Sequence, residues 1–378
     1  MINQERLVAG FIDMVRISSV SKNEALFAAY LKKKMEQIGL TVFEDDKAAV
    51  KAGVKTGNLI GKMEGNDKNA PTLMFCAHMD TVEPGNGIEP KICEGFIRSN
   101  GTTILGADDK SGIAAILEAI ICIKERNRAH GDLEIVFTFG EELGLLGAKY
   151  IDYSALRSRI GYVLDAGGTP GVIINRGPAQ NHIRAIFRGK AAHAGICPEK
   201  GINAIQVAAR AIENMQLLRV DEDTTANFGI ISGGKATNII CDEVFLDGEA
   251  RSLSELKLEL QTQKMIEAMQ KACKDFGAIL ELEIERAYPS FYVRENEEVV
   301  QLARKAAEKV GLNVQISSTG GGSDVHFFNQ AGIVTINLAT GMNKVHTTEE
   351  EISIDDLIYL ASFVEAIIEE ASPKKELG

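Results

Sequence analysis

Apolar side chains recur every three or four residues in two segments near the start of the chain, which predicts amphipathic helices at 4–16 and 23–38. Short strands are expected next at 40–44 and 58–63, with a polar segment between them. A hairpin is expected from strands at 95–98 and 102–105, which flank the turn sequence Ser-Asn-Gly.

Strongly apolar runs that follow end in imidazole or acidic side chains. LMFCA leads into His78 and Asp80, DLEIVFTFG leads into Glu141 and Glu142, and GYVLDAGG contains Asp165. Between the first two runs, GADDKSG opens a helix so apolar that it must be buried on most faces. Strands that alternate with helices and carry polar residues at their carboxyl ends indicate an α/β sheet with a site at that edge.

The pattern changes at about Ala179 to strand, helix, strand, strand, helix and strand. That order is typical of the ferredoxin-like split unit, a complete small α+β domain. A helical pattern at 296–311 and the strand IVTINLA then resume the α/β pattern of the first part of the chain. We therefore predict a phosphorylase/hydrolase-like catalytic domain with a mixed sheet at 1–178 and 288–378, interrupted by an inserted lid domain at 179–287.

Composition narrows the classes of function. The formal net charge of −12 argues against a nucleic-acid partner, because phosphate binding needs clustered Lys and Arg. The six cysteines are scattered without a Cys-x-x-Cys pair, which is typical of reduced, buried thiols. The first residues, MINQERLVAGFIDMVRI, carry charges unlike a signal peptide, and no run approaches the length of a membrane span. We expect a cytoplasmic protein with no membrane partner.

Five polar clusters lie at the ends of apolar segments: His78/Asp80, Asp108/Asp109, Glu141/Glu142, Asp165 and His346. The chemistry they suit is a two-metal hydrolase, in which one carboxylate bridges two divalent ions and each ion has further His or carboxylate ligands. The residues allow the following assignment: His78 and Asp165 for one ion, Glu142 and His346 for the other, and Asp108 or Asp109 as the bridge.

Two further carboxylates can have other roles. Asp80 follows His78 by two residues, and side chains two apart in a strand point to the same side, so Asp80 can orient the ring of His78. The alternative is a strand end where both are merely solvated. Glu141 suits a general base that moves a proton from water to a leaving amine. Adjacent side chains in extended backbone point to opposite sides, so Glu141 and Glu142 are expected to have different roles.

Nine segments resemble the zinc aminoacylase and carboxypeptidase-type metallopeptidase family, and especially its peptidase T (tripeptide aminopeptidase) branch. They run in the family's order and cover nearly the whole chain: AHMDTV, LGADDKSGIAA, FTFGEELGLLGA, VLDAGG, GKAAHAG, GGKATNII, GEARS, TGGGSD and KVHTTEE. The resemblance implies an interrupted catalytic domain with an inserted lid, and two Zn²⁺ ions. Sites of His and carboxylate also admit Mn²⁺ or Co²⁺.

The resemblance also implies roles for individual residues. It makes Asp80 the residue that orients His78 and Glu141 the base, and it selects Asp108 over Asp109 as the bridge. The implied metal ligands are His78, Asp108, Glu142, Asp165 and His346.

In the inserted domain, His193 resembles the family histidine that stabilises the oxyanion, often across a dimer. Asn238 and Arg251 resemble residues that grip the peptide backbone and its C-terminal carboxylate, a contact for which the planar fork of Arg is suited. A homodimer through this domain is expected from the family.

Two departures from the family pattern bear on substrate specificity. Family members often carry an Arg before the Gly-Gly-Thr/Ser-Asp turn, where this chain has Thr319-Gly320. The C-terminal histidine of peptidase T proper lies in a different context from NKVHTTEE. Both changes lie where the ends of a substrate would be read.

Other acidic residues are expected to be structural. Asp109, Asp324 and Asp356 are interpreted as helix N-caps. The glutamates at 349–351 are expected to form a solvated turn.

The leading hypothesis is a di-zinc exopeptidase that removes the N-terminal residue from short peptides, in particular tripeptides. The alternative on the same scaffold is a carboxypeptidase or an N-acyl-amino-acid deacylase. A non-catalytic peptide-binding protein is a third hypothesis, which the intact Glu141 disfavours.

Overall fold

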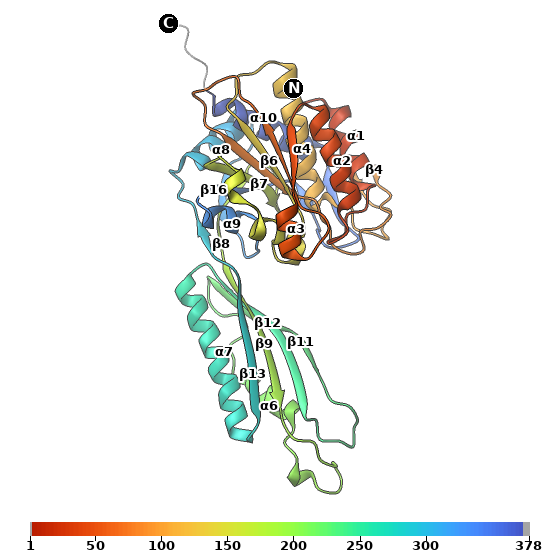
Figure 1. Ribbon diagram of the computed structural model, residues 1–378, viewed down its shortest axis with the longest axis vertical. Coiled ribbons are helices and arrows are strands. Elements are labelled where there is room, and N and C mark those ends of the chain that lie inside the picture. The colour runs from red at the N-terminus through yellow and green to blue at the C-terminus, as the bar shows by residue number, and fades with distance from the viewer. Residues whose placement is uncertain (1, 373–378) are drawn as a thin grey trace. The chain divides into compact units, whose positions relative to one another are not determined.

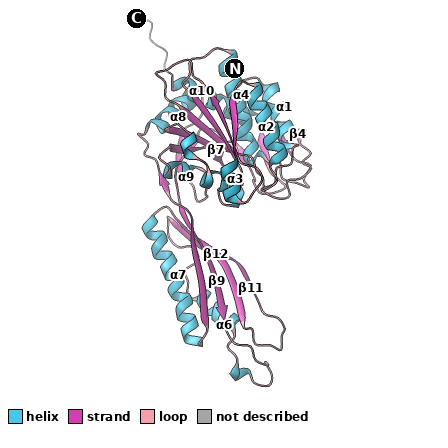
Figure 2. Cartoon of the chain, in the orientation of Figure 1, coloured by secondary structure: helices cyan, strands magenta, loops and turns pink. Residues whose placement is uncertain are grey.

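A computed structural model describes residues 2–372 as two compact units, which Figures 1 and 2 show. The first unit comprises the chain up to Arg176, Tyr292–Ser318 and the chain from Ser323 on. The second comprises Gly177–Phe291 and Thr319–Gly322. The domain boundaries expected from the sequence stay a prediction, and the place of residues 319–322 in the second unit was not expected.

Among the described residues, the main sheet of the first unit has nine strands, in the order β1-β2-β6-β3-β7-β16-β8-β14 with β15 beside β8. Strands β6, β3, β7 and β16 are mutually parallel. Strand β1 pairs antiparallel with β2, and β2 pairs antiparallel with β6, whereas β8 pairs antiparallel with β16 and parallel with β15. The predicted mixed sheet is therefore confirmed. The strand bounds are Thr41–Asp45 (β1), Asn58–Met63 (β2), Leu73–His78 (β3), Leu133–Thr138 (β6), Ile160–Ala166 (β7), Val172–Gly177 (β8), Phe291–Tyr292 (β14), Gln315–Ser318 (β15) and Val334–Ala339 (β16).

Helices cover both faces of this sheet. In β3 the ring of Phe75 stacks on that of Tyr162, whose hydroxyl donates to the carbonyl oxygen of Val299 in α8 (Glu298–Lys309). The next residue, Cys76, contacts Asp324 at the start of α9 (Val325–Gln330). Successive side chains of a strand point to opposite faces, so α8 and α9 lie on opposite sides of the sheet. This explains why β3 is a continuous apolar run.

The long helix α4 is buried from Ala107 through Ile120, as its apolar sequence predicts. It contacts strands β3 and β7 and packs against helices α1 and α10. The helix bounds of this unit are Gln4–Val15 (α1), Ala25–Gln37 (α2), Asp46–Ala52 (α3), Ala107–Glu125 (α4), Leu146–Tyr150 (α5), Glu298–Lys309 (α8), Val325–Gln330 (α9) and Ile354–Glu370 (α10).

The predicted hairpin at 95–98 and 102–105 is wrong. Strand β5 (Phe96–Arg98) instead turns back through Glu94 and Gly95 to pair with β4 (Lys91–Cys93). Both turn residues have positive φ, as a two-residue hairpin loop requires. On its other side β5 pairs with β18 (Glu351–Ser353), which pairs with β17 (Met342–Asn343), so residues far apart in sequence complete this small sheet.

The polar segment after β1 contains helix α3, which the sequence analysis missed. The carboxylate of Asp45 caps it by accepting from the N–H of Ala48, and Gly53 ends it with a φ of 70°. At α10 the expected cap is also wrong, because Ser353 rather than Asp356 is the N-cap and accepts from the N–H of Asp356.

The second unit is an antiparallel sheet with two helices, and the predicted insertion of an α+β fold into the α/β fold is confirmed. The sheet order is β10-β11-β12-β9-β13. Side chains on β9 alternate between buried and half-buried, so one face forms the core with α6 and α7. The element bounds are Ala179–Arg188 (β9), Ala204–Glu213 (α6), Leu218–Arg219 (β10), Thr224–Gly233 (β11), Glu243–Ser252 (β12), Glu255–Phe276 (α7) and Ile279–Tyr288 (β13).

Cysteine state and helix length bear on the expected environment of the protein. All six cysteines are free, and most are buried, but Cys93 is exposed because β4 lies at the edge of its sheet. Within residues 2–372, no helix combines the length and apolar character needed to cross a membrane.

Candidate active site

Parallel strands β6, β3 and β7 end at one edge of the main sheet, and the polar residues expected from the sequence lie there. His78 is the last residue of β3, and Asp165 is the next to last residue of β7. Glu141 and Glu142 follow β6 in a short 3-10 helix. Asp108 lies in the first turn of α4, and His346 lies in the loop between β17 and β18.

Asp108 lies between the two histidines. Nε2 of His78 is 2.9 Å from Oδ1 of Asp108, and Nε2 of His346 is 3.3 Å from Oδ2. Each histidine also has a second carboxylate nearby: Oδ1 of Asp165 is 3.8 Å from Nε2 of His78, and Oε1 of Glu142 is 2.8 Å from Nε2 of His346. The Asp108 carboxylate therefore presents one oxygen to each half of the cluster.

The arrangement suits divalent cations. Within the described part of the chain, three sets of imidazole and carboxylate donors have their atoms within 4.8 Å of one another: His78 with Asp108 and Asp165; Asp108 with Glu142 and His346; and His78 with Glu141 and Glu142. Nitrogen and oxygen donors of this kind hold Zn²⁺, Mn²⁺ or Co²⁺ in proteins. Asp108 belongs to two sets, as a bridging carboxylate would.

Asp109 does not cap α4, contrary to the sequence-based interpretation. The chain departs from helical geometry here, with φ and ψ of −81° and 101° at Asp108 and −121° and 31° at Asp109. The buried Asp109 carboxylate instead accepts a hydrogen bond from the backbone N–H of His78 at 3.2 Å. Asp109 thus supports the end of β3.

The carboxylate of Asp80 connects several parts of the site. It accepts hydrogen bonds from the Ser21 hydroxyl at 2.7 Å and from the N–H groups of Glu141 at 2.9 Å and Glu142 at 3.3 Å. Nδ1 of His78 lies 2.9 Å from the carbonyl oxygen of Asp80 and 3.5 Å from its carboxylate. Asp80 therefore holds the glutamate turn as well as the imidazole, and Ser21 is a participant that the sequence analysis missed.

Glu141 and Glu142 do not lie in extended backbone, so the argument that they point to opposite sides is wrong. They form a 3-10 turn that begins after Gly140, which has a φ of 58°. One carboxylate oxygen of each lies within 4.8 Å of the other and of His78. Nevertheless only Glu142 contacts His346, so their surroundings differ.

Burial and like charge shape the electrostatics of the cluster. Burial, with the Asp108 charge next, raises the pKa of Asp165 well above its ordinary range. Burial, followed by the charge of Asp165, does the same to the pKa of Glu141. Hydrogen bonds to Asp108 and Glu142 raise the pKa of His346 to about 10. Cations placed among these acids would relieve their repulsion.

Glu350 is a second participant that the sequence analysis missed. The expected solvated turn is wrong at this position, because Glu350 is 1% exposed. Its carboxylate accepts hydrogen bonds from the N–H groups of Leu105, Gly106 and Asp108. Glu349 is exposed as expected, and Glu351 is half-buried. No pattern in three consecutive glutamates distinguishes the buried one.

In the second unit, His193 and Asn238 lie on neighbouring segments. The N–H of Ala194 donates to the carbonyl oxygen of Asn238 at 2.9 Å, and His193 forms a bridge with Ile239. Nδ1 of His193 accepts from the N–H of Gly195 at 3.1 Å. The roles of His193 and Asn238 toward a substrate stay predictions.

Arg251 already has a carboxylate partner. Its Nε and Nη2 donate to the two oxygens of Glu249 at 2.7 and 2.9 Å, and its Nη1 donates to the carbonyl oxygen of Gly320 at 3.2 Å. A substrate carboxylate could meet only the remaining N–H groups of this guanidinium. Its role as a carboxylate ligand stays a prediction.

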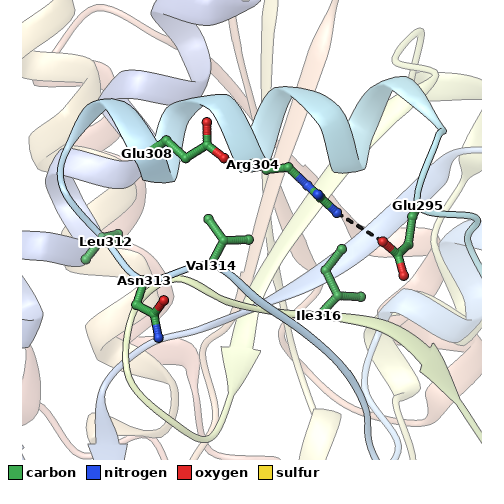
Figure 3. Close-up of a pocket in the computed structure, with 7 residues that line it drawn as sticks. All are labelled: Glu295, Arg304, Glu308, Leu312, Asn313, Val314 and Ile316. Carbon is green, nitrogen blue, oxygen red and sulfur yellow. Dashed lines mark hydrogen bonds and ion pairs between the residues drawn. The ribbon is translucent and has the colours of Figure 1, made fainter.

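A pocket of the first unit, shown in Figure 3, lies beneath α8 beside β15. Its Arg304 is paired with Glu295 at 3.0 Å. None of the predicted site residues lines it, and it offers no histidine. The lining residues are Glu295, Arg304, Glu308, Leu312, Asn313, Val314 and Ile316.

The sequence matches known proteins over most of its length. The pattern of peptidase family M20/M25/M40 matches residues 74–370. An uncharacterized protein of Bacillus subtilis strain 168, YqjE, is 47% identical over 98% of this chain and 100% of its own length.

Solved structures give the same result. Aminopeptidase PepT from Bacillus cereus ATCC 10987 is 46% identical with a TM-score of 0.92, covering 98% of this chain and 100% of that one. A tripeptidase from Staphylococcus aureus subsp. aureus Mu50 is 41% identical with a TM-score of 0.95, covering 98% and 99%. The family resemblance expected from the sequence is confirmed, and the chain belongs to peptidase family M20/M25/M40.

Proposed function

We propose that this protein is a metal-dependent aminopeptidase that removes the N-terminal residue from short peptides, in particular tripeptides. The observation that carries the proposal is the position of Asp108 between His78 and His346, each with a further carboxylate beside it. The two solved relatives, named an aminopeptidase and a tripeptidase, support the choice of substrate.

The residues present fit two divalent ions. His78 and Asp165 would hold one, Glu142 and His346 the other, and Asp108 would bridge them. The donor set has only nitrogen and oxygen atoms, and its excess of buried carboxylates calls for positive charge. When bound, such ions supply Lewis acidity to a scissile carbonyl.

Glu141 is the residue that we assign to proton transfer. Its carboxylate accepts one proton from the attacking water and returns it to the amine nitrogen as the peptide C–N bond breaks. Asp80 fixes this glutamate through the hydrogen bond that it accepts from the Glu141 N–H. Without cations, burial and the charge of Asp165 raise the pKa of Glu141. Bound cations would oppose this shift and favour the carboxylate form that takes the proton.

Several finer assignments accompany this proposal. We propose Zn²⁺ as the resident ion, with Mn²⁺ and Co²⁺ as substitutes that the same donors admit. We also retain the cytoplasmic location, the homodimer through the inserted domain, and the substrate contacts of His193, Asn238 and Arg251 as predictions.

The test is a matched pair of tripeptides that differ only in a free or an acetylated N-terminus, incubated with zinc-reconstituted protein. We expect cleavage of the free peptide alone, with release of its first residue identified by mass. Cleavage of the acetylated peptide, with release of acetate or of the C-terminal residue, would reassign the protein as a deacylase or a carboxypeptidase. Cleavage of neither would contradict the proposal.

A further inference from the structure

We propose that Glu350 is a positioning residue that holds Asp108 in place for the metal ions. The Glu350 side chain is 1% exposed and contacts the turn into α4 through both carboxylate oxygens. Oε2 accepts from the N–H groups of Leu105 and Gly106, each at 2.7 Å, and Oε1 accepts from the N–H of Asp108 at 3.0 Å. The inference rests on the proposed function in one respect, the role of Asp108 as a ligand.

The turn needs such an acceptor because of its backbone geometry. The first N–H groups of any helix have no partner within the helix. Here the non-helical dihedrals of Asp108 and Asp109 interrupt the first turn of α4, and Gly106, the residue before the helix, has no side chain that could cap it. A carboxylate from another segment fills the position of the cap and places negative charge at the helix start, where it is favoured.

The same loop reaches Asp108 twice. His346 and Glu350 lie four residues apart, with the N–H of Glu350 bonded to the carbonyl oxygen of Thr347. Nε2 of His346 contacts the Asp108 carboxylate at 3.3 Å, while Glu350 accepts from the Asp108 N–H. The loop therefore fixes both the backbone and the side chain of Asp108 relative to His346, a spacing on which a shared ion would depend.

Glu350 is suited to this role because its own position is fixed. It is buried, and β18 begins at the next residue with Glu351, which pairs with Arg98 of β5. In many metal sites, residues behind the ligands hold those ligands in place through hydrogen bonds. Glu350 would do the same for the backbone of Asp108.

The experiment compares Glu350→Gln with Glu349→Gln, the same substitution one residue earlier. Gln in place of Glu350 retains the volume but turns an amide NH₂ group toward at least one of the N–H donors. Glu349 is exposed, and Oε2 of its carboxylate lies 3.8 Å from Nζ of Lys344. Zn²⁺ affinity is measured by competition with a chromophoric chelator, without peptide, and the Tm of each metal-free variant is measured in parallel.

We expect Glu350→Gln to bind Zn²⁺ about 10–100-fold more weakly than wild type, and Glu349→Gln to bind within about twofold of it. A metal-free Tm that falls in Glu350→Gln while its Zn²⁺ affinity equals that of Glu349→Gln would overturn the proposal, because Glu350 would then be only a helix cap. Should Glu350→Gln not fold, Glu350→Asp, which retracts the carboxylate, replaces it with the same expected loss.

A second comparison tests whether Glu350 acts through Asp108. In an Asp108→Asn background, adding Glu350→Gln should lower Zn²⁺ affinity by less than about twofold, since residues that act through one another are not additive. A further loss of Zn²⁺ affinity as large as the loss that Glu350→Gln causes in the wild-type background would overturn the proposal. These affinities need no substrate, so inactivity of the wild-type protein toward tripeptides would reject the proposed function without deciding the role of Glu350.

Discussion

Strand β6 has a buried carboxylate near each end, and the two differ in their hydrogen bonds. Glu134, near the amino end, is 2% exposed and accepts from the N–H groups of Arg157 and Ser158, from the Ser158 hydroxyl and from Nζ of Lys62. Glu141, beyond the carboxyl end, is 9% exposed, and no residue of the described chain donates a hydrogen bond to its carboxylate.

The pKa shifts of the two acids have opposite directions for this reason. Burial acts to raise the pKa of both. At Glu134 the donors of Ser158, Lys62 and Arg157 together outweigh burial, and the pKa lies below its ordinary value. At Glu141 burial acts together with the charge of Asp165, and the pKa is raised. A buried acid that has its own donors stabilises the fold, whereas one placed beside other acids is suited to a cation and a proton.

Replacement of Glu141 is the change from which we expect the largest effect. Glu141→Gln should lower kcat for a tripeptide by about 10²–10⁴-fold, the range of general acid–base catalysis. Its Tm should not fall, because the substitution removes a buried like charge. Initial rates, metal content and thermal unfolding check these expectations. Turnover at the wild-type rate would contradict the assignment of Glu141 as the base.

Replacement of Glu134 should have the opposite pattern. Glu134→Gln leaves a buried N–H or hydroxyl donor without an acceptor, so we expect the free energy of unfolding to fall by about 1–3 kcal/mol. Peptide hydrolysis at 25 °C should stay within about twofold of wild type. Denaturant unfolding with parallel rate measurements tests both. An unchanged unfolding midpoint would remove the distinction between the two ends of β6.

The stability from Glu134 should also depend on pH, with the smallest effect of the three. The folded pKa of Glu134 is below its unfolded value, about 4.3. The group therefore stabilises the fold above that pH, and the contribution is lost as the pH falls through the folded pKa. The difference in unfolding free energy between wild type and Glu134→Gln should be full at neutral pH and should shrink below pH about 4. A difference that widens under acid would contradict this sign.

The main fold was predictable because its signals are local and repeated. The runs that form β3 and β6 are apolar throughout, since helices cover both faces of the sheet. The helix Asp46–Ala52 and the pairing of Phe96–Arg98 were not, because a few residues can suit a helix, a strand or a loop until tertiary contacts select one.

The site was predictable in its residue types and not in its supports. Polar residues after parallel strands lie at one edge, so the grouping around His78 followed from their order along the chain. The contact between Glu350 and the Asp108 N–H spans 242 positions, and that between Ser21 and Asp80 spans 59. Such contacts depend on the paths of loops, which no local pattern encodes.

The most direct test of the central claim is the metal stoichiometry of the wild-type chain. Metal-free protein is titrated with Zn²⁺ in a calorimeter, with Asp108→Asn as the control. We predict two ions per wild-type chain, and weaker binding of both ions in the variant because Asp108 would serve each. Binding of fewer than two ions, or binding that Asp108→Asn leaves unchanged, would contradict the account.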